Sequence, residues 1–295
     1  MITDFHTHIF PDKIAAAAVD KLSRAAHIKP FLDASAASLL ASMEKAGIGR
    51  SILLPVATAA RQVEKLNNAA ALLNEQYADP GAGRPQLLSF GAMHPDYEGW
   101  HRELSRMREL GLRGFKLHPL YQEKDIDDLS YLRIFERAAE LDLIVVTHAG
   151  YDIGYPGVVH CSPQMCRHVC DAIGPFQFVL AHMGGWRNWD EVPALLADTG
   201  AYIDTAFSTE AFPPLDDGYW DDQNTAMLDA EEFVRIVRAF GSSRVLFGTD
   251  SPWSDQEQSL RFIKKLPLSQ QELDDILSAN AERLITAQGS VPFSS

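Results

Sequence analysis

Short apolar segments recur along this chain, and each one ends at a turn signal or a polar residue. Several are almost unbroken hydrophobic runs, such as residues 143–146, which is typical of strands buried on both faces of a parallel sheet. Stretches with the spacing of amphipathic helices lie between them. The pattern predicts eight strands, over residues 2–5, 51–55, 87–92, 113–117, 143–147, 176–181, 201–205 and 244–248.

The helices between these strands carry recognisable start signals. Asp229 with Glu232, and Ser269 with Glu272, have the spacing of a capping box, in which each side chain bonds the other residue's backbone N–H. The second pair opens a helix that we expect over residues 269–287 and that would pack outside the sheet.

Eight strands that alternate with helices fit either an open doubly wound sheet or a closed barrel. An open sheet usually has a glycine-rich turn after its first strand, whereas here the first strand runs into His6-Thr7-His8. We therefore expect an α/β fold of the (β/α)8 TIM-barrel type. No linker divides the chain, so residues 1–287 are predicted to form one domain and residues 288–295 a flexible tail.

Metal-binding residue types gather at the C-terminal ends of the predicted strands, where barrels build their active sites. These positions hold five of the ten histidines with one lysine and one aspartate: His6, His8, Lys116, His118, His148, His182 and Asp250. A His-x-His pair on a strand turns both imidazoles to one side. Alone, such a pair could equally be two buried, hydrogen-bonded histidines. With a third histidine and an aspartate it forms a donor set for a divalent metal.

Five segments resemble the amidohydrolase superfamily. They are Asp4-Phe5-His6-Thr7-His8, Gly114-Phe115-Lys116-Leu117-His118-Pro119, His182-Met183-Gly184-Gly185, Phe247-Gly248-Thr249-Asp250-Ser251-Pro252 and Asn280-Ala281-Glu282-Arg283-Leu284. More narrowly, the chain is similar to the amidohydrolase-related (amidohydrolase 2) branch, which includes metal-dependent hydrolases and aminocarboxymuconate-semialdehyde decarboxylase-like enzymes. The resemblance extends from residue 2 to about residue 286.

The resemblance implies a single metal ion with four protein ligands, His6, His8, His148 and Asp250. Zinc is the expected ion, and manganese, iron or nickel are alternatives, since imidazole and carboxylate serve them all. His182 would polarise the substrate or move a proton. In binuclear relatives a lysine at the position of Lys116 is carbamylated and bridges two metals. We expect one metal and a free Lys116 that binds a substrate anion.

The reaction implied by the resemblance is hydrolysis by metal-activated water. Asp250 would accept the proton of that water and pass it to the leaving group, so that a C–N or C–O bond at a carbonyl is cut. The alternative is non-oxidative decarboxylation of an aromatic or unsaturated carboxylic acid at the same site. A third interpretation, a barrel that binds without catalysis, is disfavoured because an uncompensated cluster of histidines and aspartate is costly to bury.

Further residues are candidates for substrate contacts. Arg187 follows Trp186 and could bind a carboxylate beside an aromatic wall, although a plain surface loop is the alternative. Trp253 and His118 are further candidates. We therefore expect a small-molecule substrate, with a carboxylate as the favoured handle. The segment 210–223 is long enough to be a lid or a solvated loop.

The net charge of the chain limits the classes of partner that it can bind. It has 26 Lys and Arg against 40 Asp and Glu, a net charge of −14, which repels phosphate backbones and anionic lipids. Neither nucleic acid nor a membrane is expected as a partner, and no secretory leader or membrane span is evident. The three cysteines cannot pair completely, which favours a cytoplasmic location. The resemblance also implies a possible homodimer, since relatives are often dimers.

Overall fold

The computed structural model describes residues 1–78, 81, 83–209 and 211–286. The predicted tail 288–295, residue 287 of the last predicted helix and residue 210 of the predicted insertion lie outside these residues. Parallel strands pair in the orders β1-β2-β3 and β4-β5-β6-β7-β8-β9. Their bounds are β1 (Thr3–Thr7), β2 (Arg50–Leu53), β3 (Gln86–Ser89), β4 (Gly91–Ala92), β5 (Gly114–Leu117), β6 (Ile144–Thr147), β7 (Phe178–Leu180), β8 (Tyr202–Asp204) and β9 (Val245–Leu246).

Hydrogen bonds outside these ladders join the two sheets into a closed barrel. β3 and β4 are separated only by Phe90, whose N–H donates to the carbonyl of Leu53 at 2.9 Å. At the other seam, Phe5 N donates to Phe247 O at 2.7 Å and Asp250 N donates to His6 O at 2.8 Å. Within the described residues, the eight predicted strands are therefore confirmed as a (β/α)8 barrel, with the third strand interrupted once.

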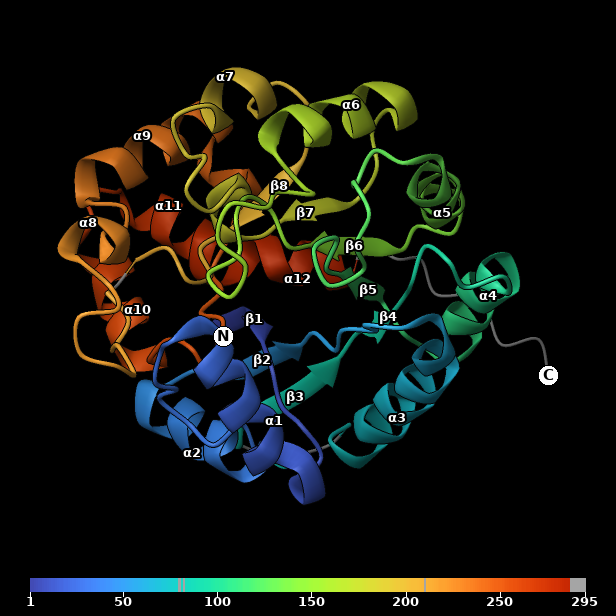
Figure 1. The fold of residues 1–295 in the computed structure, drawn as a ribbon, viewed down its shortest axis with the longest axis horizontal. Helices are drawn as coiled ribbons and strands as arrows, with labels where there is room; N and C mark the ends of the chain where they lie inside the picture. Colours follow the sequence, from blue (N-terminus) through green and yellow to red (C-terminus); the bar gives the residue numbers. More distant parts are fainter. Residues whose placement is uncertain (79–80, 82, 210, 287–295) are drawn as a thin grey trace.

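Helices surround the strands (Figure 1). Their bounds are α1 (Asp12–Ala26), α2 (Ala36–Ala46), α3 (Val63–Gln76), α4 (Trp100–Glu109), α5 (Leu129–Glu140), α6 (Pro163–Ile173), α7 (Val192–Leu196), α8 (Asp222–Thr225), α9 (Ala230–Phe240), α10 (Gln256–Lys265), α11 (Gln270–Asp274) and α12 (Asn280–Thr286). Short 3-10 turns cover Ala60–Gln62, His182–Gly184 and Ser242–Arg244. Both predicted capping boxes are present, at the starts of α9 and α11. No helix in the described ranges is long and apolar enough to span a bilayer.

The end of the chain differs from the prediction of one outer helix. A π-helical segment, Asp275–Ala279, separates α11 from α12. Ala281, Leu284 and Ile285 of α12 pack with side chains of the barrel interior such as Phe5 and Val146. Figure 1 shows α12 passing behind the strands, so this helix covers the bottom of the barrel rather than its outside.

The segment after β8 packs against the end of α1. Trp220 donates its indole N–H to the carbonyls of Ala26 and His27, both at 3.2 Å, and Phe212 and Trp220 pack with Ala26 and Ile28. Leu215 N also donates to His27 O at 2.8 Å. Phe212, Leu215 and Trp220 thus attach the described part of the predicted insertion to α1, whereas residues 216–219 are exposed to solvent.

Candidate metal centre

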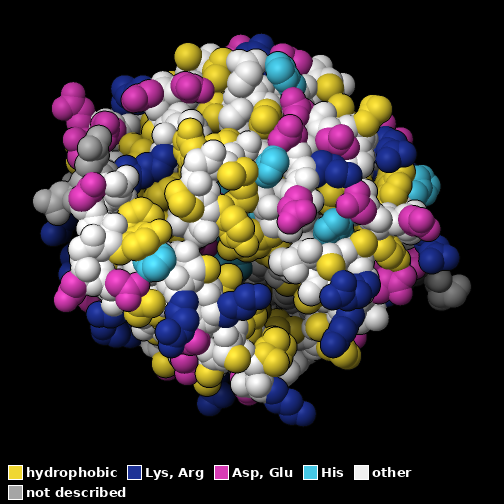
Figure 2. Space-filling view, in the orientation of Figure 1, with side chains coloured by type: hydrophobic (Ala, Val, Ile, Leu, Met, Phe, Trp, Pro, Cys, Tyr) yellow, Lys and Arg dark blue, Asp and Glu magenta, His cyan; other side chains and the backbone are white. Residues whose placement is uncertain are grey.

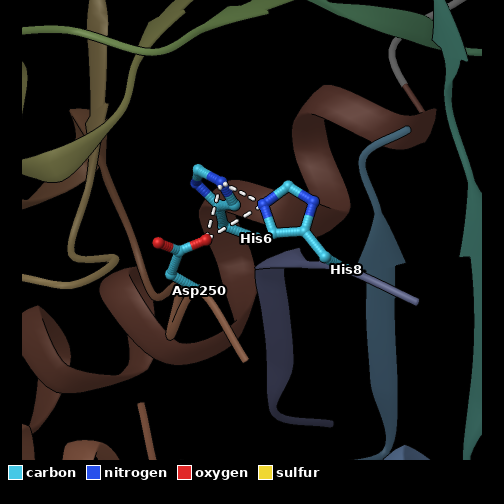
Figure 3. A group of neighbouring side chains, drawn as sticks. All are labelled: His6, His8 and Asp250. Carbon is cyan, nitrogen blue, oxygen red and sulfur yellow. Dashed lines mark hydrogen bonds and ion pairs between the residues drawn. The ribbon is translucent and has the colours of Figure 1, made fainter. Parts of the chain in front are cut away.

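Three electron-pair donors converge at the mouth of the barrel (Figure 3). Nε2 of His6 lies 3.2 Å from Nε2 of His8, and Oδ1 of Asp250 lies 3.0 Å from His8 Nε2 and 3.5 Å from His6 Nε2. Tetrahedral coordination with bonds of about 2.1 Å places ligand atoms about 3.4 Å apart. The three atoms thus already have the mutual spacing of ligands to one ion.

Hydrogen bonds on the far side of each ring determine which nitrogen is free. His6 Nδ1 lies 2.8 Å from Oδ2 of Asp204, and His8 Nδ1 lies 2.9 Å from the carbonyl of Leu54. Both partners only accept, so each Nδ1 carries the proton and each Nε2 directs a lone pair toward Asp250. Acceptor atoms this close require a cation among them, either a proton or a metal ion. The donor set fits a divalent metal.

His148 and His182 form a second pair of facing nitrogens. Nε2 of His182 lies 3.0 Å from Nδ1 of His148. The opposite nitrogens face carbonyls, His182 Nδ1 that of Ala206 and His148 Nε2 that of Tyr151, each at 3.0 Å. In the neutral rings both facing atoms are therefore lone pairs. His148 lies beside the three-donor group without joining it, and its role as fourth ligand stays a prediction.

Burial sets the protonation of these groups. It lowers the pKa of His6, His148 and His182 well below the usual value, which keeps the rings neutral and able to ligate. Burial alone would raise the pKa of Asp250. With a proton rather than a metal between the two side chains, the hydrogen bond from His8 and the charges of the neighbouring imidazoles and lysine outweigh it. The pKa of Asp250 then lies below its ordinary value and the carboxylate is ionised at neutral pH.

Lys116 lies inside the same centre. Its side chain is 1% exposed and its Nζ is 3.2 Å from Nε2 of His6. Burial lowers the pKa of Lys116 to about 8, and the charges of Asp204 and Asp250 oppose that shift. The amine is thus mostly an ammonium ion at pH 7, next to the proposed metal position.

The backbone around the centre is unusual. His182 and Asp250 have left-handed φ values of 59° and 66°, which only a few per cent of non-glycine residues adopt, Asp and His more often than most. Gly248 allows β9 to approach β1, because a Cβ there would lie 2.9 Å from the Cβ of His6. These backbone conformations direct the side chains of His182 and Asp250 into the mouth of the barrel.

Sequence analysis missed Asp204, the last residue of β8, which is fully buried. Its Oδ1 accepts the backbone N–H groups of His182 at 2.9 Å and Ala206 at 3.1 Å, while Oδ2 holds His6. The signal was available: like Asp250, it is an acidic residue at the C-terminal end of a predicted strand.

A second group of potential ligands, His118, His148 and Asp152, lies nearby. The ring of His118 is stacked between Tyr121, at 3.7 Å and 6°, and His148, at 4.3 Å and 15°. An ion must lie near the plane of each imidazole that binds it, and two nearly parallel planes do not meet close by. This group therefore does not fit one ion shared by both rings, and His118, with its Nε2 3.3 Å from Asp152, is a wall residue.

A cavity of about 540 Å³ opens over the centre. Of the predicted substrate-contact residues, Lys116, His118, Trp186 and Trp253 line it. Arg187 is not among the described lining residues: its guanidinium lies 5.0 Å from the ring of Trp186 and donates to the carbonyl of Asn224. Figure 2 shows the hollow on this face, with hydrophobic side chains gathered around it.

Comparison with known proteins identifies the family. The family model described as Amidohydrolase matches residues 3–286, so the chain belongs to that family. It is an enzyme of a metal-dependent superfamily, as the resemblance of its motifs had implied. No curated protein matches the sequence.

Solved structures confirm the barrel. An uncharacterised TIM-barrel protein from Bordetella bronchiseptica has a TM-score of 0.72 at 18% identity, covering 97% of this chain and 98% of the other. A dihydroxybenzoic acid decarboxylase from Polaromonas, with bound manganese and the inhibitor 2-nitroresorcinol, has 0.68 at 15%, covering 98% of each chain. A putative 2-pyrone-4,6-dicarboxylic acid hydrolase from Pseudomonas putida has 0.63 at 18%, covering 96% and 97%. At these identities the likeness establishes the fold.

Proposed function

We propose that this enzyme is a metal-dependent hydrolase that cuts a C–N or C–O bond at a carbonyl group. The observation that supports it is the state and position of Asp250. Its carboxylate is ionised at neutral pH, and its Oδ1 lies 3.0 Å from Nε2 of His8 and 3.5 Å from Nε2 of His6. An ionised carboxylate is a proton acceptor, which is the group that hydrolysis requires beside an attacking water.

We propose one divalent ion, zinc, held by His6, His8, His148 and Asp250. Three imidazoles and one carboxylate suit zinc, although manganese, iron and nickel accept the same donors. When bound, such an ion polarises oxygen atoms and lowers the pKa of water to about 7. Lys116 is proposed to remain uncarbamylated, as a buried ammonium ion whose charge the carboxylates of Asp204 and Asp250 favour.

Each side chain of the centre has a separate role in the proposed hydrolysis. Asp250 takes the proton of the attacking water and returns it to the leaving nitrogen or oxygen. The buried ammonium of Lys116 binds a substrate carboxylate or the negative charge that develops on the carbonyl oxygen. His182, whose Nδ1–H donates to the carbonyl of Ala206, has a lone pair at Nε2 that can accept a proton and pass it on.

Decarboxylation of an aromatic or unsaturated acid is the second candidate. It requires a group that delivers a proton to carbon, and the facing nitrogens of His148 and His182, 3.0 Å apart, are spaced to share one proton. Decarboxylases of dihydroxybenzoic acid and of 5-carboxyvanillate are among the structural neighbours, beside the putative 2-pyrone-4,6-dicarboxylic acid hydrolase. Both candidates place the substrate carboxylate at Lys116.

One assay separates the two reactions. Zinc- and manganese-loaded enzyme is incubated with aryl esters, lactones, anilides and hydroxybenzoic acids in oxygen-18-labelled water, and products are followed by mass spectrometry. Hydrolysis predicts one labelled oxygen in the product acid and no carbon dioxide. Release of carbon dioxide with an unlabelled product would overturn the hydrolase proposal in favour of the lyase. Chelator-treated enzyme is the control.

The cytoplasm remains our proposed location, supported by Cys161, Cys166 and Cys170, which are all unpaired and buried. A small carboxylate-bearing molecule is the proposed substrate. The homodimer stays a prediction.

A further inference from the structure

Helix α1 has two apolar stripes, and only one of them is explained by folding. Ala15, Val19 and Ala26 are buried against the rest of the protein. Ala18, Leu22 and Ala25, which follow each other at helical spacing, line the cavity instead. A helix at the surface normally places polar residues on the side that does not meet the core. The second stripe therefore lines a space that an apolar part of a ligand can fill.

The exposed end of the stripe supports the same conclusion. Ile14 lies one turn before Ala18 and is 52% exposed, which makes it one of the few large hydrophobic side chains on the described surface. The small side chains of Ala18 and Ala25 leave space where larger residues would close the cavity. Apolar side chains that continue from solvent into a cavity are typical of a ligand-binding wall.

Another part of the cavity wall is aromatic. Trp186, Phe207 and Trp253 line the cavity, and they belong to a small hydrophobic cluster with Ala26 and Ile28 that is separate from the barrel core. The cavity therefore has an apolar annex, lined by Ala18, Leu22, Ala25, Trp186, Phe207 and Trp253, that adjoins the donors of the metal centre. Its total volume of about 540 Å³ is in the range that holds a drug-sized ligand.

The distribution of charged residues in the cavity indicates how a ligand would be oriented. Lys116 is the buried cation of the cavity and lies among the metal donors, whereas the annex-lining residues carry no charge. The cation Lys21 also lines the cavity but is exposed to solvent. A ligand that places an anionic or carbonyl group at Lys116 can extend its apolar part into the annex.

We infer that the substrate is a carboxylic acid or acyl compound with a bulky apolar substituent, larger than one ring, and that α1 selects for this substituent. This inference rests on the proposed function of the same cavity. A compact, polar acid would gain no binding free energy from the apolar annex, because it would not fill that space.

The test is a binding series with 4-alkylbenzoates, from benzoate to 4-hexylbenzoate, on zinc-loaded protein. Quenching of tryptophan fluorescence reports binding, since Trp186 and Trp253 line the annex. Each added methylene should tighten binding about three- to fourfold, the gain expected when one CH₂ is fully buried. An affinity that does not change with chain length would overturn the inference.

Matched variants localise the effect. Ala18→Leu narrows the annex and should abolish the gain beyond the shortest chains, while Ala17→Leu, an exposed position of the same helix outside the cavity lining, should bind like wild type. Leu22→Ala widens the annex and should shift the preference to longer chains. Equal effects of Ala17→Leu and Ala18→Leu would contradict a selective role for the stripe. Thermal unfolding confirms that each variant is folded.

Turnover of the matching 4-alkylbenzoyl esters separates this inference from the proposed function. Length-dependent binding without hydrolysis rejects the hydrolase and leaves the annex intact. Hydrolysis with the same kcat/KM for short and long chains supports the hydrolase and rejects selection by α1.

Discussion

Asp204 holds the Nδ1 proton of His6 across 2.8 Å, and both side chains are buried. The carboxylate thereby fixes the His6 tautomer that leaves Nε2 free for a metal. Because the same aspartate accepts the backbone N–H of His182, at 2.9 Å, it positions two histidines of the centre at once.

Asp204→Asn should weaken metal binding about 10- to 100-fold, because an amide N–H2 facing His6 favours the wrong tautomer. The affinity is measured by competition with a chromophoric chelator. Asp216→Asn is the matched control, since Asp216 also accepts from a histidine Nδ1, that of His27 at 2.6 Å, but on the exposed surface. Unchanged affinity in the Asp204 variant would show that the pair is only structural.

Asp250→Asn should lower kcat by about 10²- to 10⁴-fold, since it removes the proton acceptor and a charged donor together. Circular dichroism should show an intact fold, because the other contacts of the loop after β9 remain. The measurement is steady-state turnover of the best substrate with saturating metal. Near-normal activity would refute the role assigned to this carboxylate.

The protein purified without chelator or a histidine tag should contain close to one equivalent of divalent metal per chain, determined by elemental analysis. Chelation should lower the melting temperature, because a ligand present at 100-fold its Kd stabilises the folded state by about 2.7 kcal/mol. Two equivalents, together with a carbamate on Lys116 detected by carbon-13 NMR, would instead establish a binuclear centre.

Lys116→Met should raise KM for carboxylate substrates by at least an order of magnitude, because it removes the buried cation of the cavity. Arg187→Met removes a cation that lies outside the cavity lining, and KM should stay within about twofold of the wild-type value. KM from initial rates checks both variants. A large KM effect at Arg187 would mean that its loop moves toward the substrate.

The strands were predictable because barrel strands are buried on both faces and so appear as apolar runs. Val145, for example, faces the helices, while Val146 faces the barrel interior. The donors His6, His8 and Asp250 were predictable because they lie at or just beyond the C-terminal ends of strands. The groups that orient the histidines were harder to predict. His8, His148 and His182 are held by backbone carbonyls, which every residue carries.

Loop residues were the least predictable part of the site. Arg187 has a φ of 64°, a backbone state that residue type does not indicate, and its side chain turns to the carbonyl of Asn224. The face of α1 that lines the cavity was not predicted, because the packing of this helix depends on the distant segment after β8 that contacts its end. Contacts between segments distant in sequence decide these features.

The reacting groups and the α1 side of the apolar annex come from different parts of the fold. His6, His148 and Asp250 stand at strand ends or just beyond them, whereas Ala18, Leu22 and Ala25 belong to a helix outside the barrel sheet. Selection can therefore reshape the helix without disturbing the ligands. In a laboratory-evolution experiment, randomising these three positions should yield new substrate ranges while every clone keeps its metal, which makes this barrel a suitable scaffold for diversification.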